Sequence, residues 1–269
     1  MKERPATFTL RCDVSKKTAQ SWQKCGREFS DRFYIRSTLR SLKRGSLAKV
    51  MIKENLQKFK TEIEKGNNLG EKITLLGATK FVSIENINLA ISLGLTHIGE
   101  NKAQEFRDKF DGYLPCEKHF IGTLQKNKLK YVVGKADVID SVSSVDLAVA
   151  IDEKAKALGI VQPIMLEINA GEEESKTGAD FSVAKLLYKS IIELKNLKLV
   201  GVMAMLPISE DEGVLATACQ RVRAFYDDIK RATPTVKHLS VGMSNDYKIA
   251  IKNGSNMIRI GSALFGERN

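Results

Sequence analysis

The sequence predicts an α/β fold, a compact (β/α)8 barrel, and three observations lead to it. Short apolar segments alternate with helical patterns from residue 51 onward, and such alternation indicates a parallel sheet. Eight apolar segments fit into about 190 residues, and eight is the strand number of this barrel. The segment 161–168, VQPIMLEI, is mostly apolar rather than alternating, as expected for a strand covered on both faces. A doubly wound open sheet is the alternative.

The expected strands are the eight apolar segments, taken in chain order. They lie near residues 73–79, 96–99, 119–122, 137–140, 161–168, 198–205, 238–241 and 257–261.

The first helix is expected over residues 51–65. Ile52, Leu56, Phe59 and Ile63 are spaced four, three and four residues apart, which places them on one helix face. Only about eight residues follow the last strand, too few for an ordinary eighth helix of the barrel. We therefore expect the first helix to pack in that gap as an extra element.

Two later helices have clear boundaries in the sequence. One is expected over 144–158, starting at Ser144 and closed by Gly159. The other is expected over 210–231, and it is entered by the run Ser209-Glu210-Asp211-Glu212, which has the pattern of a capping box.

The positive charge of the chain is concentrated at its start. The net charge is +11, with 43 Lys+Arg against 32 Asp+Glu, and residues 1–50 hold 13 of the basic and 4 of the acidic residues. Residues 51–269 therefore hold 30 against 28, so the body carries no signal for nucleic-acid binding. We interpret residues 1–50 as a basic leader outside the fold, disordered or translated from an early start, and 51–269 as the barrel. A targeting segment and a basic arm are the alternatives.

The remaining composition narrows the class of protein further. No apolar run approaches the roughly 20 residues that cross a bilayer, so no membrane is expected. The four cysteines, at 12, 25, 116 and 219, are too scattered for a disulfide framework or a C-x-x-C metal site, and they suit a reducing cytoplasm. Cys116 and His119 have the spacing of half a zinc site, but no second pair is evident, so no metal site is expected.

Lys80 stands where the first strand, ITLLGATK, ends. In a parallel barrel the carboxyl ends of the strands form the working face. The lysine could simply leave the strand for solvent. Alternatively, its amine lies in a partly apolar pocket, where desolvation lowers a lysine pKa and a neutral amine can form a Schiff base with an aldehyde.

The last two strands favour the second interpretation, because anion-binding residues follow them. Ser240, Gly242 and Ser244 belong to the seventh strand and its exit, and Arg259, Gly261 and Ser262 end the eighth. Glycines let backbone N–H groups approach an anion, hydroxyls donate to it, and the loops after strands seven and eight commonly bind phosphate in such barrels. Barrel closure makes strands one and eight neighbours. A Schiff-base lysine beside a phosphate cradle describes a site for pyridoxal 5'-phosphate (PLP).

Seven motifs in the same region resemble those of the PLP homeostasis proteins, whose fold is that of the N-terminal barrel of alanine racemase. They are LLGATK (75–80), IGENKAQE (98–105), KHFIGTLQKNK (118–128), INAGEEESKTG (168–178), GVMAM (201–205), LSVGMSNDYKIAI (239–251) and MIRIGSALFG (257–266). The resemblance covers about residues 51–269. One departure is Lys118, where the family usually has an aromatic residue.

The resemblance implies roles for five residues. Lys80 would form the internal aldimine with the cofactor, and Arg259 would face the pyridine nitrogen. Ser244, with the backbone of Gly261 and Ser262, would hold the phosphate. A permanently charged donor at the ring nitrogen makes the cofactor a weaker electron sink.

Other polar residues receive a structural interpretation. We expect His97, His119 and His238 to be packed or structural, Asn101 and Asn169 to lie at the working face, and Lys176 to pair with the acids at 172–174.

Two function classes follow. The first is a carrier that is not an enzyme: a monomer that buffers PLP in the cytoplasm and delivers it to PLP-dependent apo-enzymes. The second is a PLP-dependent amino-acid racemase-like enzyme, which needs proton-transfer groups on both faces of its substrate. The chain stops soon after the last strand, without the second domain that supplies the opposite base in the racemase, so we favour the carrier. A Schiff-base aldolase is a weaker third option.

Overall fold

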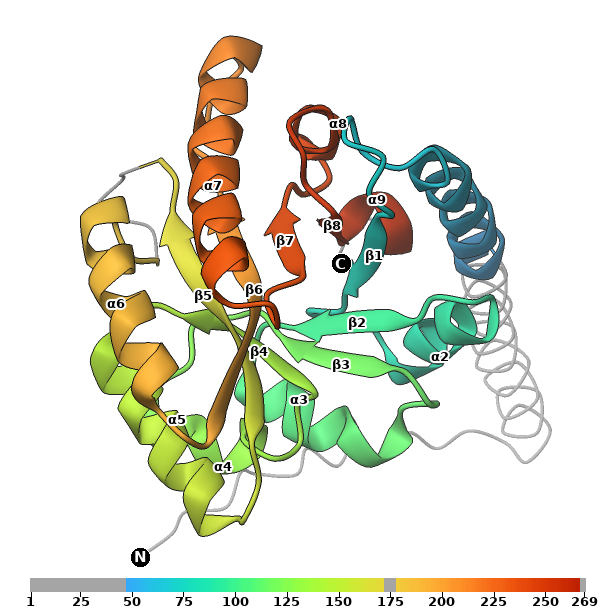
Figure 1. Ribbon diagram of the computed structural model, residues 1–269. Helices are drawn as coiled ribbons and strands as arrows, with labels where there is room; N and C mark the ends of the chain where they lie inside the picture. Colours follow the sequence, from blue (N-terminus) through green and yellow to red (C-terminus); the bar gives the residue numbers. More distant parts are fainter. Residues whose placement is uncertain (1–46, 172–177, 267–269) are drawn as a thin grey trace, which may run out of the picture. The chain divides into compact units, whose positions relative to one another are not determined.

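A computed structural model of the protein describes residues 47–171 and 178–266, and residues 48–269 form one compact unit. Eight parallel strands follow one another around a closed barrel, β1 beside β2 and so on until β8 pairs with β1 (Figure 1). The strands are β1 (Thr74–Ala78), β2 (His97–Glu100), β3 (Glu117–Phe120), β4 (Val138–Val142), β5 (Gln162–Asn169), β6 (Leu197–Met205), β7 (His238–Val241) and β8 (Met257–Ile260). The predicted barrel is confirmed, and the open sheet is excluded.

Helices surround the barrel. They are α2 (Ile84–Ser92), α3 (Ala103–Lys109), α4 (Leu129–Val132), α5 (Val145–Ala157), α6 (Phe181–Glu193), α7 (Glu212–Ala232), α8 (Tyr247–Lys252) and α9 (Ser262–Phe265), with single 3-10 turns at Phe110–Gly112 and Lys126–Lys128. Among the described residues, no helix is long and apolar enough to span a bilayer. Residues 1–46 of the predicted leader lie outside the described residues, so the structure does not test that prediction. Residues 47–50 are described, and they are helical.

The starts of α5 and α7 show how side-chain caps fix helix boundaries. Ser144 is the cap of α5, as predicted, and its hydroxyl accepts from the backbone N–H of Leu147 at 3.2 Å. The prediction that a capping box opening at Ser209 starts α7 is wrong, because Asp211 is the capping residue and the helix begins at Glu212. The Asp211 carboxylate accepts from the backbone N–H of Gly213 at 2.7 Å. A carboxylate at this position also interacts favourably with the helix dipole.

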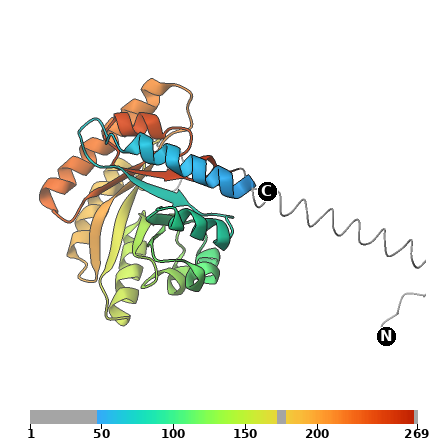
Figure 2. The ribbon, with the colours of Figure 1, turned by 90° about the vertical axis from the view of Figure 1, so that its right-hand side faces the viewer.

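The N-terminal helix, described over 47–63, fills the gap that the short α9 leaves. Ile52, Leu56 and Phe59 are buried in a cluster with residues of β1, β8 and α9. Asn55 adds a hydrogen bond from Nδ2 to the carbonyl of Leu264, at 3.3 Å. Figure 2 shows this helix, in blue, lying along the side of the barrel. The expectation that it packs as an extra element is confirmed.

Leu56→Ala tests how much this helix stabilises the barrel. Leu56 is 2% exposed, so removing its side chain leaves a cavity that costs about 2–5 kcal/mol of unfolding free energy. Gln57→Ala, an exposed position on the same helix, is the matched control and should change stability by less than about 0.5 kcal/mol. Urea denaturation measures both, and equal values for the two variants would contradict the packing described here.

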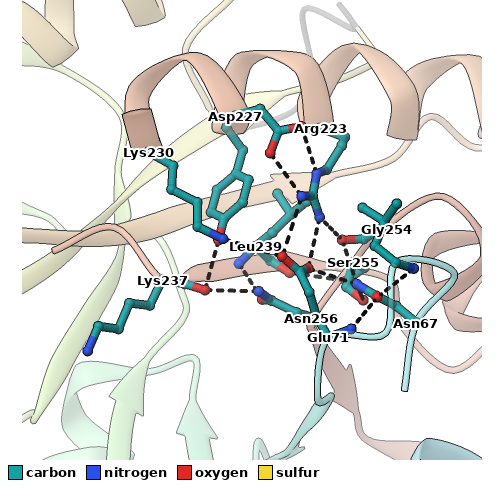
Figure 3. Close-up of polar contacts among 12 residues, drawn as sticks. Asn67, Glu71, Arg223, Asp227, Lys230, Lys237, Leu239, Gly254, Ser255 and Asn256 are labelled. Atoms are coloured by element: carbon teal, nitrogen blue, oxygen red, sulfur yellow. Dashed lines mark hydrogen bonds and ion pairs between the residues drawn. The ribbon is translucent and has the colours of Figure 1, made fainter. Parts of the chain in front are cut away.

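A polar network ties the segment before β1 to α7 and to the turn after α8 (Figure 3). Arg223 of α7 donates from Nη1 to Glu71 Oε2 and to the carbonyl of Gly254, both at 2.9 Å. Asn67 Nδ2 donates to the same Glu71 oxygen at 2.9 Å, and Lys230 Nζ lies 3.3 Å from Glu71 Oε1. Burial raises the pKa of Glu71, but Arg223, Asn67 and Lys230 outweigh it and hold the pKa at about 2.

Glu71→Gln tests this network through its pH dependence. A carboxyl whose pKa is lowered on folding, here from 4.5 to about 2, stabilises the fold above the unfolded-state pKa and loses that contribution as pH falls toward 2. The carboxylate is about a quarter exposed, so after solvent screening we expect a cost on the order of 1 kcal/mol at pH 7. The cost should shrink as pH falls through the acid range. Glu64→Gln, at an exposed position, is the control; a pH-independent cost at Glu71 would contradict the account.

Candidate functional site

Lys80 lies two residues beyond β1, at the carboxyl end of the barrel strands. Its side chain is half-buried, and Nζ lies 5.2 Å from the centroid of the Phe81 ring. Lys102 Nζ approaches the same ring to 4.2 Å. Phe81 has a φ of 61°, the one positive φ at a non-glycine residue among those described. Strained backbone of this kind is concentrated at functional sites, so the turn that carries Lys80 is a candidate functional site.

The residues beneath Lys80 fix the end of β1 against β2. Thr79 is fully buried, and its hydroxyl lies 3.1 Å from Glu100 Oε2. Glu100 is 1% exposed and forms an ion pair with Lys109 Nζ at 3.1 Å. Lys109 Nζ also lies 3.4 Å from the carbonyl of Thr79. An ion pair with a buried carboxylate of this kind constrains the backbone from which Lys80 projects.

Arg259 of β8 crosses the barrel interior to two other strands. It is 4% exposed, and Nη1 donates to the carbonyl and the hydroxyl of Ser240, at 2.6 and 2.9 Å. Nη2 donates to the carbonyl of Ala204 at 3.0 Å. Burial lowers the pKa of Arg259, and more distant carboxylates partly offset this effect. No carboxylate of the described residues forms an ion pair with Arg259, so carbonyl and hydroxyl dipoles hold the guanidinium in place.

The structure gives Ser240 a different position from the one that the sequence suggested. The sequence predicts Ser240 to be an anion donor together with Gly242 and Ser244, but it lies within β7 and is fully buried. Its hydroxyl interacts with Arg259 instead. The strand continues through Val241, so the turn begins only at Gly242, whose φ of 100° favours glycine.

The two turns that end β7 and β8 touch each other. Ser244 is half-buried in the turn after β7, and its hydroxyl accepts from the backbone N–H of Ala263 in α9, at 3.5 Å. Gly261 is buried and precedes α9, and Ser262 is the exposed first residue of that helix. The structure thus brings Ser244, Gly261 and Ser262 to one place in the fold.

Pairing of β1 with β8 connects this place to Lys80. Leu76 pairs with Arg259, and Gly77 with Ile260. Because the strands are parallel and in this register, Lys80 and Ser262 leave neighbouring strand ends on the same face of the barrel. The set of groups there comprises an amine, a buried guanidinium, hydroxyls and glycine backbone, which fits an aldehyde-bearing aromatic phosphate.

A cavity of about 520 Å³ lies elsewhere, between the end of the N-terminal helix and the start of β1. Its lining includes Lys60, Lys65 and Lys72. The start of β1 is the opposite end of the strand from Lys80, so this cavity is separate from the groups around Lys80, Ser244 and Ser262.

His119 is packed inside the barrel, as the sequence indicated. It is fully buried, and Nδ1 lies 2.8 Å from Asp140 Oδ1, a partner that the sequence analysis did not identify. Cys116, considered as half of a zinc site with His119, is half-buried, and burial raises its pKa to about 11. The potential metal ligands that converge with His119 do not include Cys116.

The structure describes two of the three remaining predicted residues. Asn101 follows β2 and Asn169 ends β5, so both lie at the carboxyl face as expected. Lys176 and its expected acidic partners at 172–174 lie outside the described residues.

Comparison with known proteins identifies the family. The family model described as "Alanine racemase, N-terminal domain" matches residues 52–269. The pyridoxal phosphate homeostasis protein of Aquifex aeolicus is 38% identical over 80% of this chain and 94% of its own length. That of Helicobacter pylori strain 26695 is 34% identical over 77% of this chain and 95% of its own length.

Solved structures agree on the fold. PipY of Synechococcus elongatus PCC7942 with PLP bound is 26% identical, with a TM-score of 0.70, over 80% of this chain and all of PipY. An alanine racemase of Clostridium difficile is 17% identical, with a TM-score of 0.67, over 80% of this chain and 56% of the racemase, and it shows the fold alone. The chain belongs to the pyridoxal phosphate homeostasis protein family, built on the alanine racemase N-terminal barrel.

Proposed function

We propose that this protein binds pyridoxal 5'-phosphate through a Schiff base at Lys80, and that it buffers the cofactor and delivers it to apo-enzymes. The observation that carries the proposal is the pairing of β1 with β8, which sets the Lys80 turn beside the turns at Ser244 and Gly261. The names of the curated relatives support a role in PLP homeostasis, at 34–38% identity for the two described above.

Lys80 is the covalent attachment point in this proposal. Its uncharged amine adds to the aldehyde carbon, and loss of water leaves a carbon–nitrogen double bond that water can reverse. Reversibility suits a carrier, because the cofactor stays attached until water hydrolyses the double bond, and it then leaves unchanged. The half-buried position beside Phe81 leaves the amine accessible while covering part of the side chain.

Arg259 faces the ring nitrogen, and the turns hold the phosphate. The guanidinium is fixed by Ser240 and Ala204, so it presents a permanent positive charge without reorganising. PLP supplies an electron sink to enzymes that protonate its ring nitrogen, and a charged donor at that atom weakens this property. Ser244 donates its hydroxyl to the phosphate, while Gly261 and Ser262 donate backbone N–H groups.

We therefore favour a monomeric protein that binds PLP without turnover. The alternative is a racemase-like enzyme, which the shared fold suggests. Incubating the PLP-loaded protein with L- and D-alanine separates the two. Racemisation well above that of free PLP would support the enzyme, and a rate equal to that of free PLP supports the carrier.

Lys80→Ala tests the attachment point. The wild-type protein with PLP should show the visible absorption of a protonated Schiff base, and the variant should lose it while keeping the far-ultraviolet circular dichroism of the fold. Lys102→Ala is the matched control, because its amine lies against the same Phe81 ring. If the two variants lose the absorption equally, or if neither does, Lys80 is not the specific attachment point.

Arg259→Met tests the buried cation. The substitution removes the charge and leaves the carbonyls of Ser240 and Ala204 without their donor. We expect PLP affinity to fall about tenfold or more, because hydrogen bonds to charged groups contribute about 1.5–3 kcal/mol. Equilibrium dialysis measures the affinity, and circular dichroism checks the fold. Unchanged affinity in a folded variant would rule out contact between Arg259 and the cofactor.

A further inference from the structure

Two histidines and a glutamate converge at the amino-terminal ends of β2 and β3. Lys80 and the turns after β7 and β8 lie at the opposite end of the barrel. His97 is the first residue of β2, Glu117 is the first residue of β3, and the two are paired across the strands. His119 follows two residues later on β3, so its side chain is on the same face as that of Glu117. Figure 1 shows β2, β3 and β4 side by side.

The separations between these side chains are those of ligands around one ion. His97 Nε2 lies 3.2 Å from Glu117 Oε2, and His119 Nε2 lies 3.3 Å from Glu117 Oε1. One ligand atom from each of the three residues lies within 4.8 Å of the others. Two atoms that each lie about 2.0–2.2 Å from a zinc ion, at a tetrahedral angle, are about 3.3–3.6 Å apart. The two separations that involve Glu117 are therefore already close to those between ligands of one zinc ion.

Both imidazoles are already oriented by a second partner. His119 Nδ1 lies 2.8 Å from Asp140 Oδ1, and His97 Nδ1 lies 2.8 Å from the hydroxyl of Thr96. The other ring nitrogen of each histidine then points at Glu117. A metal-binding histidine almost always has its second nitrogen held by a carboxylate, a backbone carbonyl or water, which fixes the ring and raises its basicity. Asp140 matches this pattern directly, and the Thr96 hydroxyl takes the acceptor's place at His97.

A buried atom in the group has no satisfactory partner. His119 is fully buried, and its Nε2 makes no hydrogen bond to the described residues, although Glu117 Oε1 lies 3.3 Å away. A buried nitrogen without a partner costs free energy, so such an atom needs an explanation. The side chain of Glu117 is 40% exposed and that of His97 is 19% exposed, so an ion can reach the group from solvent.

We propose that His97, Glu117 and His119 bind a transition-metal ion of the zinc class at the amino-terminal mouth of the barrel. Two imidazoles and one carboxylate are a zinc ligand set with a fourth position left for water. Imidazole nitrogen disfavours Mg²⁺ and Ca²⁺, which take oxygen ligands. Asp140 and Thr96 are positioning residues, and the ion would join β2 to β3.

The rival explanation is a proton in place of the ion. Burial lowers the pKa of His119, but Asp140 and Glu117 outweigh it and raise the pKa to about 9. A protonated imidazole between two carboxylates would be a purely structural ion pair. The two explanations differ in one measurable respect, since only the first gives a stoichiometric metal complex that depends on His97.

The experiment uses the full-length chain, stripped with a chelator and titrated with ZnCl2 by calorimetry, with the bound metal counted by mass spectrometry after dialysis. We expect one zinc ion per chain. His97→Gln and Glu117→Gln should weaken binding at least tenfold, and Asp140→Asn should weaken it by about 10–100-fold, as is typical of residues that orient ligands. His97 and Glu117 are partly exposed, so these two variants keep the test valid even if Asp140→Asn fails to fold.

Three controls separate this site from other zinc-binding groups. His238→Gln removes the remaining histidine of the chain, which also begins a strand but is not in the group, and should bind zinc like wild type. A Cys12→Ser, Cys25→Ser double variant excludes thiols of the leader and should also bind normally. Lys80→Ala should bind normally too, so a failed PLP experiment would leave this one unaffected. Absent stoichiometric zinc, or equal binding by wild type, His97→Gln and Glu117→Gln, would overturn the proposal.

Discussion

Hydrogen bonding between β1 and β8 is the constraint on which the site depends. It closes the barrel, and its register sets Leu76 beside Arg259 and Gly77 beside Ile260. The first and last strands of the sheet therefore end side by side, although about 180 residues separate them in the chain. The N-terminal helix packs over the same seam through Ile52 and Leu56, so the seam is covered where the four-residue α9 alone would leave it open. Without this closure, Lys80 would not lie beside the turns that follow β7 and β8.

Much of this arrangement could be predicted from the sequence, because apolar segments and turn residues are local signals. The predicted segments contain or overlap all eight strands, and the cap at Ser144 is where the sequence placed it. The start of α7 was not predictable from its capping pattern, because Ser209 and Asp211 both fit a cap and only the geometry selects Asp211. The role of Ser240 was missed for a different reason. Whether a serine at a strand end faces the interior or joins the turn depends on one residue of register, and here it binds Arg259.

Contacts between individual polar side chains could not be predicted from the sequence. Glu100 lies in the motif IGENKAQE and Lys109 lies four residues beyond it, yet nothing local indicates that they pair beneath the Lys80 turn. His97 and Glu117 are 20 residues apart and have no recognisable ligand spacing, so the cluster emerges only when β2 and β3 align. The two ends of the barrel thus present different chemistry. The carboxyl end carries an amine, hydroxyls and a buried guanidinium, and the amino end carries two imidazoles and carboxylates.

Borohydride reduction of the PLP-loaded, full-length protein, followed by peptide mass mapping, tests the central claim most directly. Reduction makes a Schiff base permanent, so the modified peptide reports which amine held the cofactor. The account predicts one phosphopyridoxyl group per chain, on Lys80. Modification spread over several surface lysines, or confined to a lysine far from β1 and β8, would contradict it.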